Sequence, residues 1–153
     1  MTALAAFLPR LLLVLLFLPF SAWDKIANFG GAAGQAREIG IGAGAARMLI
    51  LCGLALEVAG SLAVLAGVAD RLAALLLALY CIATALLWKR FWREPGSVYG
   101  AGTGDRRALF FDFWKNLAVA GGFLMLAFGP QGTGLDALLA APFGSTLPYA
   151  VQP

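Results

Sequence analysis

The feature that most constrains this chain is an apolar run from Arg47 to Val68 that carries one carboxylate, Glu57, at its middle. The run is too apolar for a soluble helix and long enough to cross a bilayer. At about 1.5 Å per residue, Glu57 lies roughly 15 Å from Arg47, near the midplane of a hydrocarbon layer about 30 Å thick. A charge at that depth is costly, so the run predicts a membrane helix that holds Glu57 inside a bundle.

Small residues indicate how this helix packs. Gly53, Gly60 and Gly67 recur every seven residues and share a helical face with Glu57. The next apolar run has its own face of small residues: Ala74, Ala78, Cys81 and Ala85. Because small residues line helix contacts in lipid, we expect the two faces to meet in an antiparallel hairpin.

The composition sets the fold class. The chain is 61% hydrophobic and 12% charged, whereas an ordinary soluble domain is about 25% charged. This excludes a soluble fold and predicts an all-α integral membrane protein, a single domain built as a four-helix bundle. The second connection is short, the first and third are longer, and a polar tail with one short helix at 135–141 ends the chain. The expected spans and tail are 4–23, 47–68, 72–88, 110–128 and 129–153.

The first connection, residues 28–45, is rich in glycine and alanine. It predicts a short interfacial or re-entrant segment. Its Gly-Ile-Gly-Ala-Gly stretch at 40–44 resembles a dinucleotide-binding turn, but a membrane span follows it and no strand precedes it, so we reject a nucleotide site.

The basic residues sit beside the apolar spans, which indicates a role in topology and argues against a nucleic-acid surface. The side with the two long connections has nine lysines and arginines, and the other side has only Arg10 and Arg71. By the positive-inside rule, both termini are expected in the periplasm. The nine are Lys25, Arg37, Arg47, Lys89, Arg90, Arg93, Arg106, Arg107 and Lys115.

The chain has no histidine, which removes the common zinc and axial-haem ligand sets, and no metal centre is expected. Its two cysteines, Cys52 and Cys81, lie in apolar runs without a neighbouring cation that would stabilise a thiolate. We therefore favour packing roles for both over a redox pair.

Three segments occur in an order typical of one family: FLPFSAWDK at 17–25, LEVAGSLAVLAGVADRL at 56–72 and KNLAVAGG at 115–122, followed by Gly129-Pro130. With them the chain resembles the DoxX-like family of small four-helix bacterial membrane proteins. The resemblance implies a relation to the small membrane subunit of a thiosulfate:quinone oxidoreductase and to membrane complexes of thiol stress. The positions that carry over are Asp24, Lys25, Glu57, Lys115 and Asn116. A histidine common in relatives after the third span is replaced here by WKRFW at 88–92, so histidine-dependent chemistry is not expected.

Glu57 has two interpretations. It is a carboxylate that exchanges protons or contacts a quinone, or it is an internal polar pin, neutral or paired with Lys25 or Lys115. Aromatic residues near the third connection could bracket a quinone ring, but an interfacial belt is the simpler interpretation. These are Trp88, Phe91, Trp92, Phe110, Phe111, Phe113 and Trp114.

The leading functional hypothesis is a membrane anchor or quinone-site subunit of a respiratory or thiol/sulfur redox complex in the bacterial inner membrane. The chain would have no independent enzymatic activity, its ligand would be a quinone, and its partners would be the lipid bilayer, redox enzyme subunits and a second copy of itself. The alternatives are a small proton-coupled transporter and a purely structural or assembly protein.

Overall fold

The computed structural model describes residues 2–99, 104–129, 132 and 134–150. Within these ranges every regular element is a helix, and four helical stretches are long and apolar enough to cross a membrane. They are Ala3–Ala27, Ala43–Ala66, Asp70–Arg93 and Gly104–Phe128. The expected all-α architecture with four spans is therefore confirmed. Pro130 of the Gly129-Pro130 motif and the last residues of the tail, 151–153, lie outside the described residues.

The first span is one continuous helix with a widened turn in its middle. It consists of α1 (Thr2–Val14), the π-helical turn η1 (Leu16–Ser21) and α2 (Ala22–Ala27). Pro19 lies inside η1. Proline has no N–H to donate and its ring crowds the preceding turn, and a π turn accommodates both effects. Ser21 is the last residue of this turn, so the turn sets the direction of the residues that follow it.

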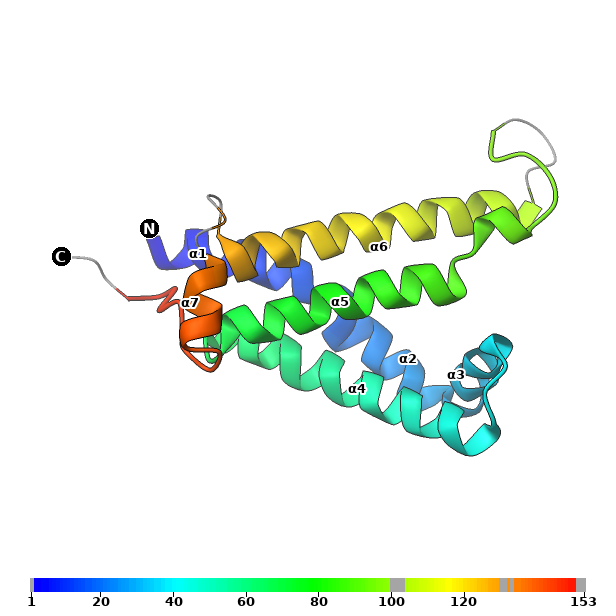
Figure 1. The fold of residues 1–153 in the computed structure, drawn as a ribbon, viewed down its shortest axis with the longest axis horizontal. Helices are drawn as coiled ribbons and strands as arrows, with labels where there is room; N and C mark the ends of the chain where they lie inside the picture. Colours follow the sequence, from blue (N-terminus) through cyan, green and yellow to red (C-terminus); the bar gives the residue numbers. More distant parts are fainter. Residues whose placement is uncertain (1, 100–103, 130–131, 133, 151–153) are drawn as a thin grey trace.

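The first connection is itself helical. It contains α3 (Phe29–Ala36) and the 3-10 turn η2 (Arg37–Ile39), and α4 (Ala43–Ala66) follows. The side chain of Asn28 caps α3 by accepting a hydrogen bond from the backbone N–H of Gly31 at 3.2 Å. The predicted short segment is thus a capped helix that lies beside the start of α4 (Figure 1).

The second half of the bundle contains α5 (Asp70–Trp88), η3 (Phe91–Arg93), α6 (Gly104–Phe128) and α7 (Gly134–Ala140). Helix α6 starts six residues before the expected span, because the polar residues Asp105, Arg106 and Arg107 continue the helix. Helix α7 agrees with the predicted short helix within a residue at each end. Both termini lie at one end of the bundle, and α3 and the start of α6 lie at the other (Figure 1).

Helix α5 is the central element and packs most extensively against α6 and then against α4. The core is a cluster from α1, η1, α4, α5 and α6: Val14, Phe17, Val64, Leu77 and Phe123 are its larger members. The small residues Ala74, Ala78, Cys81 and Ala85 of α5 are all buried, as expected.

The glycine face of α4 meets large side chains. A Cβ at Gly53 would lie 3.2 Å from the Tyr80 hydroxyl, and a Cβ at Gly60 would lie 3.1 Å from Leu77 Cγ. Gly53 and Gly60 of α4 therefore pack against Tyr80 and Leu77 of α5, and not against the small residues Ala74, Ala78, Cys81 and Ala85. Gly67 has a different role, because it ends α4 with φ +70°, a left-handed conformation that favours glycine.

Candidate functional site

A buried ion pair joins the first two spans. Glu57 on α4 is 1% exposed, and Lys25 Nζ on α2 lies 2.8 Å from its Oε1 and 3.1 Å from its Oε2. The Ser21 hydroxyl accepts a hydrogen bond from Lys25 at 2.6 Å and donates one to Glu57 at 3.1 Å. The three side chains form a closed polar triangle inside an apolar bundle, so neither charge is left without a partner.

The local sequence explains why this triangle forms. Ser21 and Lys25 are four residues apart, and side chains at that spacing lie on the same face of a helix. Ser21 is the last residue of the π turn and Lys25 lies on α2, which follows it. Glu57 lies on the helix face of α4 that carries Gly53 and Gly60. Of the two lysine partners that the sequence left open for Glu57, the structure selects Lys25.

The triangle lines a cavity of about 260 Å³. The cavity has walls from four spans and from α3, and they mix charged, polar and aromatic side chains. Its lining residues are Leu16, Phe17, Ser21, Lys25, Gln35, Glu57, Tyr80, Thr84, Trp88, Lys89 and Asn116.

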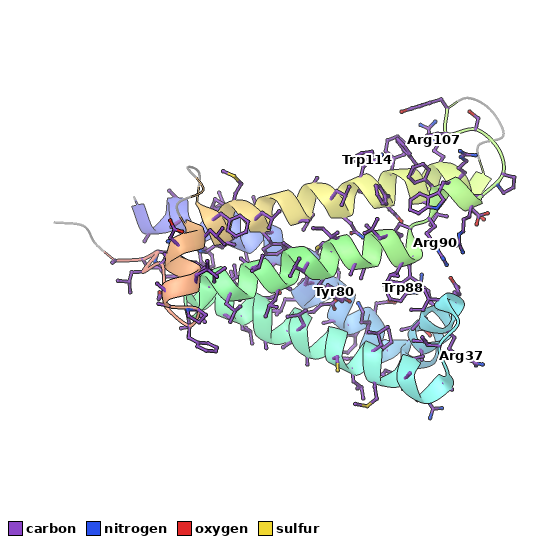
Figure 2. The ribbon with its side chains drawn as sticks, in the orientation of Figure 1. Arg37, Tyr80, Trp88, Arg90, Arg107 and Trp114 are labelled. Atoms are coloured by element: carbon purple, nitrogen blue, oxygen red, sulfur yellow. The ribbon has the colours of Figure 1, made fainter. Side chains whose placement is uncertain are left out.

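A second hollow, of about 250 Å³, lies between α3, α4 and α5 and is almost entirely apolar. It shares four wall residues with the Glu57 cavity: Gln35, Tyr80, Thr84 and Trp88. Tyr80 and Trp88 extend from the side of α5 that faces α4 and α3 (Figure 2). The Trp88 indole N–H donates a hydrogen bond to the backbone carbonyl of Gln35 at 3.0 Å, which ties α5 to α3 at this wall.

Lys115 and Asn116 are adjacent in sequence but differ in position. Asn116 lines the Glu57 cavity, whereas Lys115 is 69% exposed and pairs with Asp112 at 2.6 Å. Lys89 also pairs with Asp112, at 3.4 Å. Lys115 is therefore not the partner of Glu57 in the described structure, because it points along its own helix to the carboxylate three residues earlier.

Asp24 does not join the site. It is exposed and does not line the Glu57 cavity. Asp24 precedes Lys25 by one residue, and successive residues of a helix point about 100° apart, so the burial of Lys25 directs Asp24 outward.

A second buried ion pair was not anticipated. Arg10 on α1 lies 3.4 Å from the carboxylate of Asp70, which is 4% exposed at the start of α5. The tail completes the arrangement: the Thr146 backbone N–H donates to Asp70 at 2.9 Å, and the Thr146 hydroxyl donates to the other carboxylate oxygen. The sequence signal was Arg10, a charge near the start of an apolar run, which we had interpreted as a marker of topology alone.

The tail binds the same end of the bundle at further points. The Ser145 hydroxyl donates to the carbonyl of Gly67, and the Tyr149 hydroxyl donates to the carbonyl of Leu65 at 2.5 Å. Residues 145–149 of the predicted polar tail are therefore a strap across the ends of α4 and α5.

The cysteines lie in different surroundings. Cys81 is buried in the core, and Cys52 is exposed and lines the apolar hollow. In the part of the chain that the structure describes, no group of three or more Cys, Asp and Glu side chains could hold a metal ion.

Most of the aromatic residues near the third connection lie away from the Glu57 cavity. Phe91, Trp92, Phe110, Phe113 and Trp114 interlock through edge-to-face contacts near the start of α6. Of the predicted aromatic residues Trp88 lines the cavity, and the other aromatic wall residues, Phe17 and Tyr80, were missed because each reads as an ordinary core residue.

The comparisons with known proteins agree with this fold. The sequence model of the DoxX family matches residues 5–90. The chain is 28% identical over 128 residues to the inner membrane protein YphA of Escherichia coli, which covers 83% of the chain and 84% of that protein. It is 32% identical over 131 residues to the inner membrane protein YqjF of Escherichia coli. This match covers 85% of the chain and 88% of that protein. No solved structure matches it significantly. With four membrane-spanning helices and these relatives, the chain is an integral membrane protein that belongs to the DoxX family.

Proposed function

We propose that this protein binds a lipophilic carrier of the quinone class in the Glu57 cavity and serves as the membrane subunit of a redox complex. The observation that carries the proposal is the combination of a buried ion pair with an adjoining apolar hollow. A quinone has the same two parts, a polar ring and an apolar tail. Each hollow alone is slightly smaller than the roughly 300–1,000 Å³ of a typical ligand site, and the two with their shared wall reach that size.

The residues present fit such a ligand. The ring oxygens of a quinone accept hydrogen bonds, and the side-chain amide of Asn116 supplies a donor at the cavity wall. Tyr80 and Trp88 supply flat surfaces against which a ring can stack. The apolar hollow, with Leu49, Ile50 and Leu56 in its wall, suits an isoprenoid tail.

When bound, the quinone would supply the electron-carrying chemistry. The chain itself would orient the ring, exclude bulk water and hold the carboxylate of Glu57, fixed by Lys25 and Ser21, where it can accept a proton. Nothing in this set acts as an independent catalyst, so the electrons would come from a partner subunit.

We also infer an inner-membrane location with both termini in the periplasm. Arg37, Arg90 and Arg107 gather at the end of the bundle opposite to the termini (Figure 2). An excess of arginine and lysine at one end favours the cytoplasm for that end.

The test is the quinone content of the purified protein. The protein is extracted from its native membrane in a mild detergent, and bound quinone is quantified per chain by mass spectrometry for the wild type, Glu57→Gln and Glu38→Gln. We expect wild type and Glu38→Gln to retain quinone and Glu57→Gln to lose most of it, because Glu38 is exposed and lines neither hollow. Equal quinone content in all three would contradict the proposal.

The same preparation tests the partner. A redox enzyme subunit that co-purifies with the tagged chain would support the role as a membrane subunit. If the chain purifies alone, the transporter hypothesis predicts solute flux into vesicles that hold this protein only. Absence of both a partner and flux would leave the structural or assembly role.

A further inference from the structure

A second hollow with a different chemistry lies where α3 meets the start of α4. Its volume is about 320 Å³, and small residues form its wall: Gly30, Ala33 and Gly34 of α3 and Ala43 of α4. Phe29 adds an aromatic edge, and two arginines, Arg37 and Arg47, complete the wall.

The glycines leave this space open. Gly30 and Gly34 are one helical turn apart on α3, and a Cβ at either position would have no heavy atom within 4 Å. Side chains of the described residues therefore do not fill this part of α3. Glycine in a helix is less stable than alanine, so Gly30 and Gly34 destabilise α3. Internal packing does not require glycine at either position.

The two arginines reach the hollow from different elements. Arg37 follows Gly34 by three residues and Gly30 by seven, so all three lie on one side of the segment. Arg47 follows Ala43 by four residues and lies above it on α4. Among the described residues, neither guanidinium has a hydrogen-bond or ion-pair partner.

The surroundings add to the positive potential. Glu38 is the carboxylate next to Arg37 in sequence, and it forms no ion pair with either arginine. Helix α4 begins at Ala43 after an extended Gly42 and has no side-chain cap, and Ala43 lines this hollow, so the positive end of the helix dipole lies beside it. The hollow is therefore lined by positive charge. It lies at the end of the bundle where Figure 2 shows Arg37.

We propose that this hollow binds a phosphate-type oxyanion through Arg37 and Arg47. The planar fork of arginine matches phosphate oxygens with two parallel hydrogen bonds, and both arginines line this one hollow. Phosphates of this kind occur in the headgroup of an anionic phospholipid and in soluble phosphate compounds. The inference is independent of the quinone site, because none of the residues that line this hollow lines the Glu57 cavity.

The experiment is native mass spectrometry of the detergent-purified full chain, titrated with phosphatidylglycerol or with phosphatidylcholine. The variants are Arg37→Gln/Arg47→Gln, the filled hollow Gly34→Leu, and the matched control Arg90→Gln/Arg93→Gln at the same end of the bundle. Gly34→Leu keeps both charges, and leucine favours a helix more than glycine does, so loss of binding in this variant does not require loss of the fold.

We expect wild type to bind phosphatidylglycerol about 30-fold more tightly than Arg37→Gln/Arg47→Gln, since each arginine near an anionic headgroup contributes about a factor of five. Gly34→Leu should also lose the preference for phosphatidylglycerol, and the control should keep it. A competing effect of millimolar inorganic phosphate would identify a soluble phosphate compound as the ligand source, and its absence would identify the lipid. Equal binding by wild type and Arg37→Gln/Arg47→Gln, or an equal loss in the control, would overturn the proposal.

Discussion

Removal of Lys25 should destabilise the bundle strongly because it leaves the buried carboxylate of Glu57 without an ion-pair partner. In the Lys25→Met variant, Glu57 loses two contacts of 2.8 and 3.1 Å and keeps Ser21 as its hydrogen-bond partner in the described structure. Glu57 is 1% exposed, so its carboxylate gains little hydration from bulk water when the ammonium group is removed. Breaking a buried pair by removing one partner costs about 3–5 kcal/mol, and we expect a loss of that size in the free energy of unfolding.

Changes at Glu57 should cost less. Glu57→Gln keeps an amide oxygen that accepts hydrogen bonds from Lys25 and Ser21, and Lys25 is 16% exposed and can shift toward water. We expect a loss of about 1.5–3 kcal/mol, the range for one hydrogen bond to a charged group. The double variant Lys25→Met/Glu57→Met removes both charges and should lie within about 1 kcal/mol of the wild type, because replacing a whole buried pair by apolar side chains is often neutral.

The assay is reversible unfolding in detergent micelles or bicelles, with Lys115→Met as the matched control. Lys115 also pairs with a carboxylate, but it is 69% exposed, so its removal should change stability by less than about 1 kcal/mol. A Lys25→Met variant as stable as the wild type would contradict this prediction. So would a double variant that loses as much free energy of unfolding as the two single variants together.

Two further predictions concern the tail and the helix contact. Thr146→Val removes the hydroxyl that donates to the buried carboxylate of Asp70 and should cost about 1.5–3 kcal/mol in thermal unfolding; an unchanged stability would show that the tail does not hold this end of the bundle. Gly60→Leu should cost about 1–3 kcal/mol because a Cβ there already lies 3.1 Å from Leu77, whereas Gly121→Leu enters open space and should cost nothing. Equal stability of the two glycine variants would contradict the packing described for α4.

The overall fold could be predicted because membrane spans depend on local composition. Length and hydropathy alone locate four spans, and α6 was too short in the prediction only because the charges from Asp105 to Arg107 were assigned to a loop. A helix can continue past the hydrocarbon layer with polar residues, and hydropathy does not report that extension.

The site was predicted in part. Glu57 could be identified because a single carboxylate in a long apolar run has few explanations. The partner of Glu57 could not be identified, because Lys25 and Lys115 both lie at span ends. Which lysine pairs with Glu57 depends on the rotation of each helix about its axis. That rotation follows from the π turn at Pro19 and from packing against Tyr80 and Leu77, which are interactions between distant segments.

The strap across Asp70 lay beyond sequence reasoning for a similar reason. Thr146 is 76 residues from Asp70, and a threonine in a tail rich in glycine and proline carries no signal of a buried partner. The charge of Arg10 was correctly placed at a span end, but a charge near an interface is expected whether or not it has a partner.

The most direct test of the central claim is photo-crosslinking with an azido-quinone in native membranes, followed by mass spectrometry of the labelled peptides. We expect labels at the shared wall of the two hollows, on peptides with Tyr80, Thr84 and Trp88, and loss of these labels when unmodified quinone competes. Labels confined to lipid-facing positions such as Leu79, or labels that competition does not reduce, would contradict a quinone site beside Glu57.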